Sequence, residues 1–170
     1  MSQTPPITAG PPSPELIGQL FDRHGPALVL YARQLCHSPD DVLQEALVRF
    51  ASLGECPRDA LAWLFRAVRN GALTAARASR RRKKHEALAV EARPREFAPA
   101  AGDRLDAEAT AQALARLPEL EREIVVARIW GGLTFVEIGR LVGMSDSSAQ
   151  RNYVAALGAL RTQMLSRGLT

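Results

Sequence analysis

The sequence predicts an all-α protein with two small helical domains, a flexible linker between them, and a helix-turn-helix in the second domain. Apolar residues recur at three- and four-residue steps through most of the 170 residues, which is typical of amphipathic helices. The periodicity stops at residues 88–104, which contain two prolines and a glycine and no sustained apolar face. We therefore expect a disordered tail at residues 1–14, a first domain at 15–87, the linker at 88–104 and a second domain at 105–170.

Start and stop signals divide the first domain into three helices. The first begins near Glu15, and an irregularity is expected at Gly25–Pro26 because proline lacks an amide hydrogen. Ser38–Asp41 combines a capping serine, a proline and two acids, and so opens a second helix. A loop at residues 53–58 separates it from Asp59, the predicted N-cap of a long amphipathic helix.

Positive charge is concentrated at the end of this third helix. The formal net charge is only +4, yet residues 77–84 hold six basic residues and no acid. Helical geometry places a polar, mostly basic stripe opposite the apolar face, formed by Arg66, Asn70, Arg77, Arg81 and Lys84. The lack of acids favours contact with phosphates, and a solvated charged face is the alternative. Trp63 lies off the apolar stripe and is predicted either to pack against the preceding loop or to stack on an unpaired base.

The strongest local signal lies at residues 134–151. Thr134 and Glu137 have the spacing of a capping box, Gly143 ends the helix, and Ser145 begins another after a short turn. Two short helices joined by a tight glycine-containing turn form a helix-turn-helix, whose second helix enters the major groove of DNA. The residues predicted to point away from the apolar stripe, toward DNA, are Ser147, Ser148 and Arg151. The alternative is a plain antiparallel helix pair in a helical core.

Metal, membrane and enzymatic functions find little support. Cys36 and Cys56 are the only cysteines, and no zinc-site spacing occurs among them and His24, His37 and His85, so we expect no metal site. No apolar run reaches the ~18 residues of a membrane span, and the N-terminus lacks a secretory signal, so we expect no membrane insertion and a cytoplasmic location. We also expect no enzymatic activity and no cofactor, since no phosphate loop or nucleophile–base set occurs.

Two groups of residues resemble a known family. Asp41–Leu47, Ala62–Asn70 and the basic end of the long helix resemble conserved region 2 of extracytoplasmic-function sigma factors of the sigma-70 family. Leu114–Pro118, followed by Gly132–Gly139 and the helix-turn-helix, resembles region 4. The resemblance covers about residues 15–165, and two independent motifs in this order are more specific than either alone.

The resemblance implies a protein that binds core RNA polymerase and directs promoter recognition and DNA melting. In that family, region 2 binds the polymerase clamp helices and opens the −10 element, while region 4 reads the −35 element and contacts the polymerase flap. The linker would run through the active-site and RNA-exit channels, and the loop at residues 53–58 would hold a flipped base. Promoter DNA and core polymerase are thus the implied partners, and an anti-sigma factor is a further candidate.

Functional residues are carried over by position. Those implied for polymerase binding are Asp41, Gln44 and Glu45, with a helix-cap role as the alternative for Asp41. Those implied for the −10 element and melting are Trp63, Arg66, Arg69, Asn70, Arg77, Arg80, Arg81 and Lys84. Those implied for the −35 element are Ser147, Ser148, Gln150 and Arg151.

The chain departs from the sequence pattern of the family at two places, and one other function competes with that of a sigma factor. Residues 148–152 are less basic than the family often is early in the recognition helix, so the −35 sequence is not predicted and upstream binding is expected to be weak. Gly139 replaces the usual alanine, which we expect to affect packing only. The competing function is a stand-alone transcriptional regulator acting without polymerase, which explains the second domain but gives the first no purpose.

Overall fold

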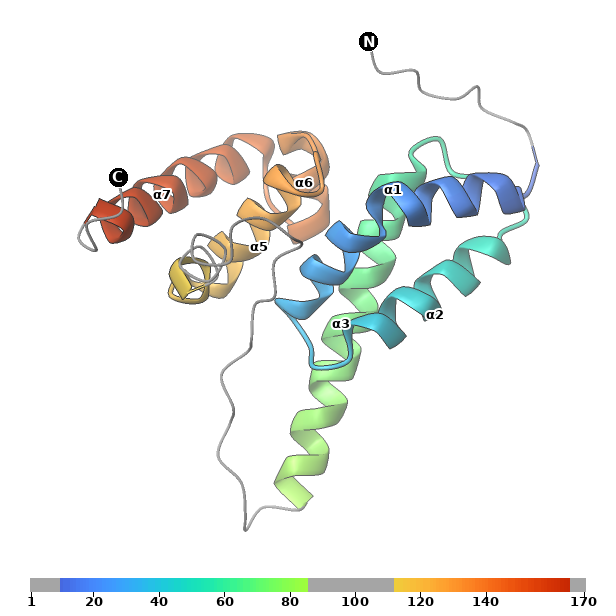
Figure 1. Cartoon of the computed structure of the whole chain (residues 1–170), viewed down its shortest axis with the longest axis horizontal. Helices are drawn as coiled ribbons and strands as arrows, with labels where there is room; N and C mark the ends of the chain where they lie inside the picture. The colour runs from blue at the N-terminus through green and yellow to red at the C-terminus, as the bar shows by residue number, and fades with distance from the viewer. Residues whose placement is uncertain (1–9, 86–111, 166–170) are drawn as a thin grey trace.

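The computed structural model describes residues 10–85 and 112–165, and all regular secondary structure in these residues is helical (Figure 1). The helices are α1 (Pro14–Arg33), α2 (Pro39–Ala51), α3 (Ala60–His85), α5 (Glu119–Ile129), α6 (Phe135–Val142) and α7 (Asp146–Leu165), and residues 112–115 are also helical. The predicted all-α fold is confirmed. The predicted linker lies outside the described residues, as do residues 1–9 of the predicted tail.

Capping side chains fix where several of these helices begin. The Asp59 carboxylate accepts a hydrogen bond from the Ala62 amide at 2.9 Å, as predicted for the start of α3. Ser13 caps α1 in the same way, with its hydroxyl 3.2 Å from the Leu16 amide nitrogen. Ser38 stands at the N-cap position of α2 as predicted, but the side-chain cap expected there is wrong: no capping hydrogen bond forms, because the backbone of Ser38 (ψ 63°) is far from the extended conformation of a typical N-cap.

The irregularity predicted at Gly25–Pro26 is also wrong, since α1 is helical from end to end with Pro26 inside it. Proline removes one helical hydrogen bond, but residues on both sides of it pack into the same core. Leu20 and Leu28, which flank the proline, both contact the main apolar cluster. Tertiary packing therefore overrides the local preference.

The N-terminal helices α1–α3 and the C-terminal helices α5–α7 share the main apolar cluster, and a second, smaller cluster lies within the C-terminal part. Within each group the helices pack on one another, and α5 also packs on α1 while α6 packs on α3. The main cluster accordingly runs from Phe50 in α2 through Phe65 in α3 to Ile138 in α6. In Figure 1 the last turns of α3 project beyond the other helices.

Candidate nucleic-acid and polymerase interfaces

The helix-turn-helix is built from α6, a short turn and α7. Thr134 and Glu137 form the predicted capping box: the Glu137 amide donates to the Thr134 hydroxyl at 3.3 Å, and the Thr134 amide donates to the Glu137 carboxylate at 2.6 Å. Gly143 ends α6 in the left-handed conformation at φ 80°, which glycine adopts without strain. The Ser145 hydroxyl then accepts from the Ser148 amide at 3.2 Å and caps α7. The predicted motif is confirmed.

Gly139 determines how tightly this turn closes. A Cβ atom at Gly139 would lie 2.7 Å from the carbonyl oxygen of Met144, which is closer than real Cβ contacts. The turn backbone therefore lies directly against α6 at this position. The departure from the family's usual alanine is a packing feature, as expected, and it matches a turn that leaves no room for a methyl group.

The first turns of α7 present a small polar face to solvent. Ser147, Gln150 and Arg151 are exposed, whereas Ser148 is half-buried. The Arg151 guanidinium donates to the Ser148 hydroxyl at 3.0 Å, so Ser148 orients the arginine within the structure. Arg151 is the only cation among the four residues predicted for the −35 element.

Val154 extends this face and was missed by sequence reasoning. Its side chain is 61% exposed, and it lies three residues after Arg151 and seven after Ser147, on the same side of α7. An exposed apolar side chain in this position can contact the methyl group of thymine. The spacing of Val154 from Ser147 and Arg151 indicates this position, but a single valine was not assigned to any surface from the sequence.

The exposed face of α3 carries an unpaired positive track. Arg66, Asn70, Arg77, Arg80 and Arg81 are all exposed, and among the described residues none of these four arginines forms an ion pair. Lys84 belongs to α3, but its side chain lies outside those that the structure describes. Unpaired arginines on a projecting helix suit the binding of a polyanion.

Arg69 is in a different environment from the rest of this set. Its guanidinium is half-buried and binds the carboxylate of Glu123 in α5, with Nε 2.5 Å from Oε1. Burial alone would lower the pKa of Arg69, but the hydrogen bond and charge of Glu123 raise it on balance. Arg69 therefore faces the C-terminal helices in this arrangement, and its contact with DNA stays a prediction.

Trp63 packs mainly against α2. Its ring centroid lies 5.4 Å from that of Phe50, in a tilted arrangement. One part of the side chain also borders a small pocket that includes Arg66 in α3 and Glu137 in α6. The aromatic ring is thus partly available at the junction of α3 and α6.

The residues predicted to bind polymerase line one exposed face of α2. Asp41, Gln44 and Glu45 are all exposed, and Glu45 pairs with Arg49 at 2.8 Å. Val48, which is 60% exposed, continues the same face one turn further along. Sequence reasoning did not select this valine, although its spacing from Asp41 and Glu45 places it with them.

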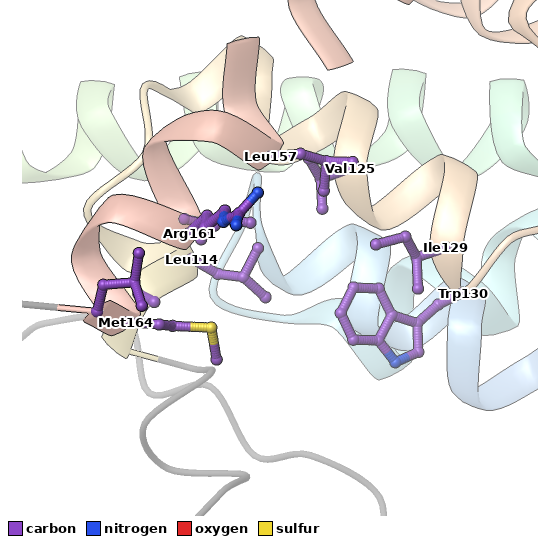
Figure 2. A pocket seen from close by; sticks show the side chains of 10 residues that line it. Leu114, Val125, Ile129, Trp130, Leu157, Arg161 and Met164 are labelled. Atoms are coloured by element: carbon purple, nitrogen blue, oxygen red, sulfur yellow. The ribbon is translucent and has the colours of Figure 1, made fainter. Parts of the chain in front are cut away.

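A mainly apolar pocket lies between α5 and the end of α7. The pocket holds about 410 Å³. Figure 2 shows Ile129 and Trp130 on one side of it and Arg161 and Met164 on the other. Leu157 also lines it and is 37% exposed, so this part of α7 faces the pocket. The pocket is suited to an apolar segment of a partner.

Metal and membrane sites are lacking in the part of the chain that the structure describes. No group of three or more His, Cys, Asp or Glu side chains in it could hold a metal ion. No helix in it has the length and apolar character needed to cross a bilayer.

A helix-turn-helix joined to a second helical unit with a basic projecting helix defines a DNA-binding transcription protein. Residues 20–82 match the family model for Sigma-70 region 2, and residues 107–160 match that for Sigma-70, region 4. The chain belongs to the sigma-70 family, in its extracytoplasmic-function (ECF) class. Members of this family are sigma factors rather than enzymes, and the chain functions in promoter recognition by RNA polymerase.

A curated relative agrees with this assignment, and two solved structures share the fold. The ECF RNA polymerase sigma factor SigL of Mycobacterium tuberculosis is 29% identical over 166 residues, which cover 91% of this chain and 92% of SigL. The sigma factor RpoE from Bartonella quintana, solved with the anti-sigma factor NepR, has a TM-score of 0.70 at 21% identity, covering 89% of this chain and 98% of RpoE. CnrH, solved with the cytosolic domain of CnrY, has a TM-score of 0.61 at 24% identity, covering 91% and 90%.

Proposed function

We propose that this sigma factor divides promoter recognition and polymerase binding among four surfaces. The first turns of α7 read the −35 element through Ser147, Gln150, Arg151 and Val154. The exposed face of α3 holds the −10 element during melting. The exposed face of α2 binds the polymerase clamp helices, and the pocket between α5 and α7 receives an apolar segment of the flap.

The observation that carries the proposal is the chemical difference between the surfaces. The α3 face is basic and unpaired, as phosphate contact requires, whereas the α7 face combines hydroxyl, amide, guanidinium and apolar groups, as base reading requires. The loop between α2 and α3 adds a place for a flipped base, since Gly54 and Glu55 there are exposed. These features accompany matches to both regions in the order that the family has.

The protein acts in the cytoplasm beside the polymerase, without catalytic activity or a cofactor of its own. An anti-sigma factor is a further partner, in keeping with the partner of RpoE in its solved structure. Such a partner would compete with polymerase for the α2 face or for the pocket.

Run-off transcription with purified core polymerase on a panel of native promoters tests the proposal. The chain should direct specific transcripts that core polymerase alone does not make. Gel-shift titration of the free chain on the same promoters provides the control for the stand-alone regulator. Tight sequence-specific binding by the free chain, with no dependence on core polymerase, would favour the regulator and exclude the proposed function.

A further inference from the structure

The segment before α1 contacts the α2–α3 loop (residues 53–58), the loop that would hold a flipped base. The Cys56 amide in this loop donates a hydrogen bond to the Gly10 carbonyl at 2.7 Å. Among the described residues, it is the one backbone–backbone hydrogen bond that residues 54–58 form. Figure 1 shows the connection between α2 and α3 passing beside the start of α1. The position of the loop backbone therefore depends on a segment that lies far earlier in the sequence.

The backbone conformation of Gly10 makes this contact specific to glycine. Its φ of 151° lies in a region that residues with a side chain rarely adopt. A Cβ atom at Gly10 would meet nothing within 4 Å beyond its chain neighbours, so the conformation, and not a lack of space, requires glycine here. An alanine at this position would therefore disturb the hydrogen bond to Cys56 without causing a steric clash.

A buried proline and a helix cap hold the segment in place. Pro12 is buried, whereas Pro11 and Ser13 on either side of it are exposed. Proline restricts φ, so the segment loses little conformational entropy when it packs. Ser13 then caps α1 through the Leu16 amide, which fixes the other end of the segment. We call Gly10–Pro12 the N-terminal brace.

The α2–α3 loop is anchored in the core and exposed at its tip. Leu53 and Cys56 pack against the main apolar cluster, whereas Gly54–Glu55 is exposed. Pro57 borders the same small pocket as Trp63, one of the residues predicted for the −10 element. A shift of the loop backbone would therefore move its exposed tip relative to Trp63.

We propose that the N-terminal brace positions the α2–α3 loop for the binding of a flipped base of the −10 element. The inference rests on the function proposed above, which places that base at the loop. Extruding a base from the duplex costs free energy, and a loop that is already ordered loses less entropy when it binds. Fixed hydrogen-bonding groups also distinguish one base from another better than mobile groups do. The brace thus acts on base preference through the loop and does not itself touch DNA.

Two pairs of variants separate the brace from the rest of the N-terminus. Gly10→Ala disfavours the observed backbone conformation. Gly18→Ala is its matched control, because Gly18 is an exposed glycine within α1 where a Cβ atom also meets nothing within 4 Å. Deletion of residues 2–9 keeps the brace, whereas deletion of residues 2–12 removes it, and both deletions keep the Ser13 cap of α1.

Hydrogen exchange of the Cys56 amide, measured by NMR in the free chain, reports whether the brace holds the loop. Exchange through local opening depends on the opening equilibrium, and one hydrogen bond is worth about two- to tenfold in an equilibrium. Gly10→Ala should therefore raise the exchange rate of this amide by about two- to tenfold, and deletion of residues 2–12 by at least as much. Gly18→Ala and deletion of residues 2–9 should keep the wild-type rate.

Base preference of the assembled holoenzyme tests the positioning role. The probes are single-stranded oligonucleotides with the non-template −10 sequence of a native promoter, each position changed in turn, and fluorescence anisotropy gives their affinities. Gly10→Ala and deletion of residues 2–12 should reduce the discrimination between bases by about two- to tenfold at one position and leave the other positions unchanged. A merely structural role would instead weaken the binding of every oligonucleotide alike.

A wild-type exchange rate at Cys56 in both brace variants would overturn the inference. Faster exchange with unchanged base discrimination, or with a uniform loss of affinity, would overturn it as well. Circular dichroism checks folding, and Gly10→Ala decides the matter if the longer deletion loses helix content. A wild-type holoenzyme without base preference in the −10 strand would instead overturn the proposed base site, while the exchange rates would still report whether the brace holds the loop.

Discussion

Three arginines on the exposed face of α3 allow a quantitative test of promoter contact. Arg66 and Arg81 are about 22 Å apart along the helix axis, with Arg77 between them. At 3.4 Å per nucleotide of a duplex strand, this length matches about six phosphates, so each arginine can reach a different one. Replacing all three by glutamine nearly preserves helix propensity and removes the charge. Each lost phosphate contact lowers the slope of log affinity against log salt by about 0.9 for duplex or 0.7 for single-stranded DNA, about 2.1–2.7 in total.

Promoter binding by preassembled holoenzyme, measured by fluorescence anisotropy over a range of salt concentrations, gives this slope. Over a fourfold rise in salt, the wild type should lose affinity by a factor about 20–40 times larger than the triple variant does. Arg23→Gln, at an exposed position of α1, is the control for charge loss elsewhere and should keep the wild-type slope. A triple variant with the wild-type slope and normal open-complex formation would refute the phosphate contacts, and loss of core binding would assign this face to a protein interface.

Three further predictions concern single residues. Arg151→Ala should cost ~1–3 kcal/mol of binding at the −35 element and relax base preference there; equal losses on unrelated upstream sequences would make Arg151 a phosphate anchor. Thr134→Ala removes the α6 cap and should lower the free energy of unfolding by ~0.5–2 kcal/mol in denaturant titration, whereas Thr134→Ser should retain most of it. Burial and the hydrogen bond with Glu137 raise the pKa of Asp59, so its stabilising contribution is lost as pH rises through that pKa. Asp59→Asn, which keeps a capping oxygen, should therefore gain stability relative to the wild type between acidic and neutral pH, and a difference independent of pH would contradict this.

The local structure was largely predictable because its causes lie within a few residues of sequence. The capping box at Thr134, the left-handed end at Gly143 and the cap at Asp59 each depend on neighbouring backbone groups. The exceptions, Ser38 and Pro26, are positions where the backbone conformation or packing of distant residues decided the outcome. Helix periodicity likewise located the exposed face of α3, whereas the exposed residues of α2 were identified from the family resemblance.

The contact between the two regions was not predictable from sequence. No local sequence signal distinguishes Glu123 from the exposed acids, yet it is buried against Tyr31 and Arg69. Its partners are 92 and 54 residues away, and no helical period links them. Burial of a charged residue depends on where its partner comes to lie in three dimensions, which a single sequence does not specify. For the same reason, the family resemblance placed Arg69 together with arginines that are exposed.

The two surfaces that we propose face DNA differ in charge, and this difference would tie promoter binding to assembly with polymerase. Phosphate contacts supply affinity without sequence preference, and base contacts supply preference. The α3 face has several unpaired arginines, whereas the predicted −35 residues in α7 include Arg151 alone as a cation. Helix α7 therefore brings little affinity of its own, and its reading of the −35 element depends on polymerase holding it at the right distance, which raises its effective concentration.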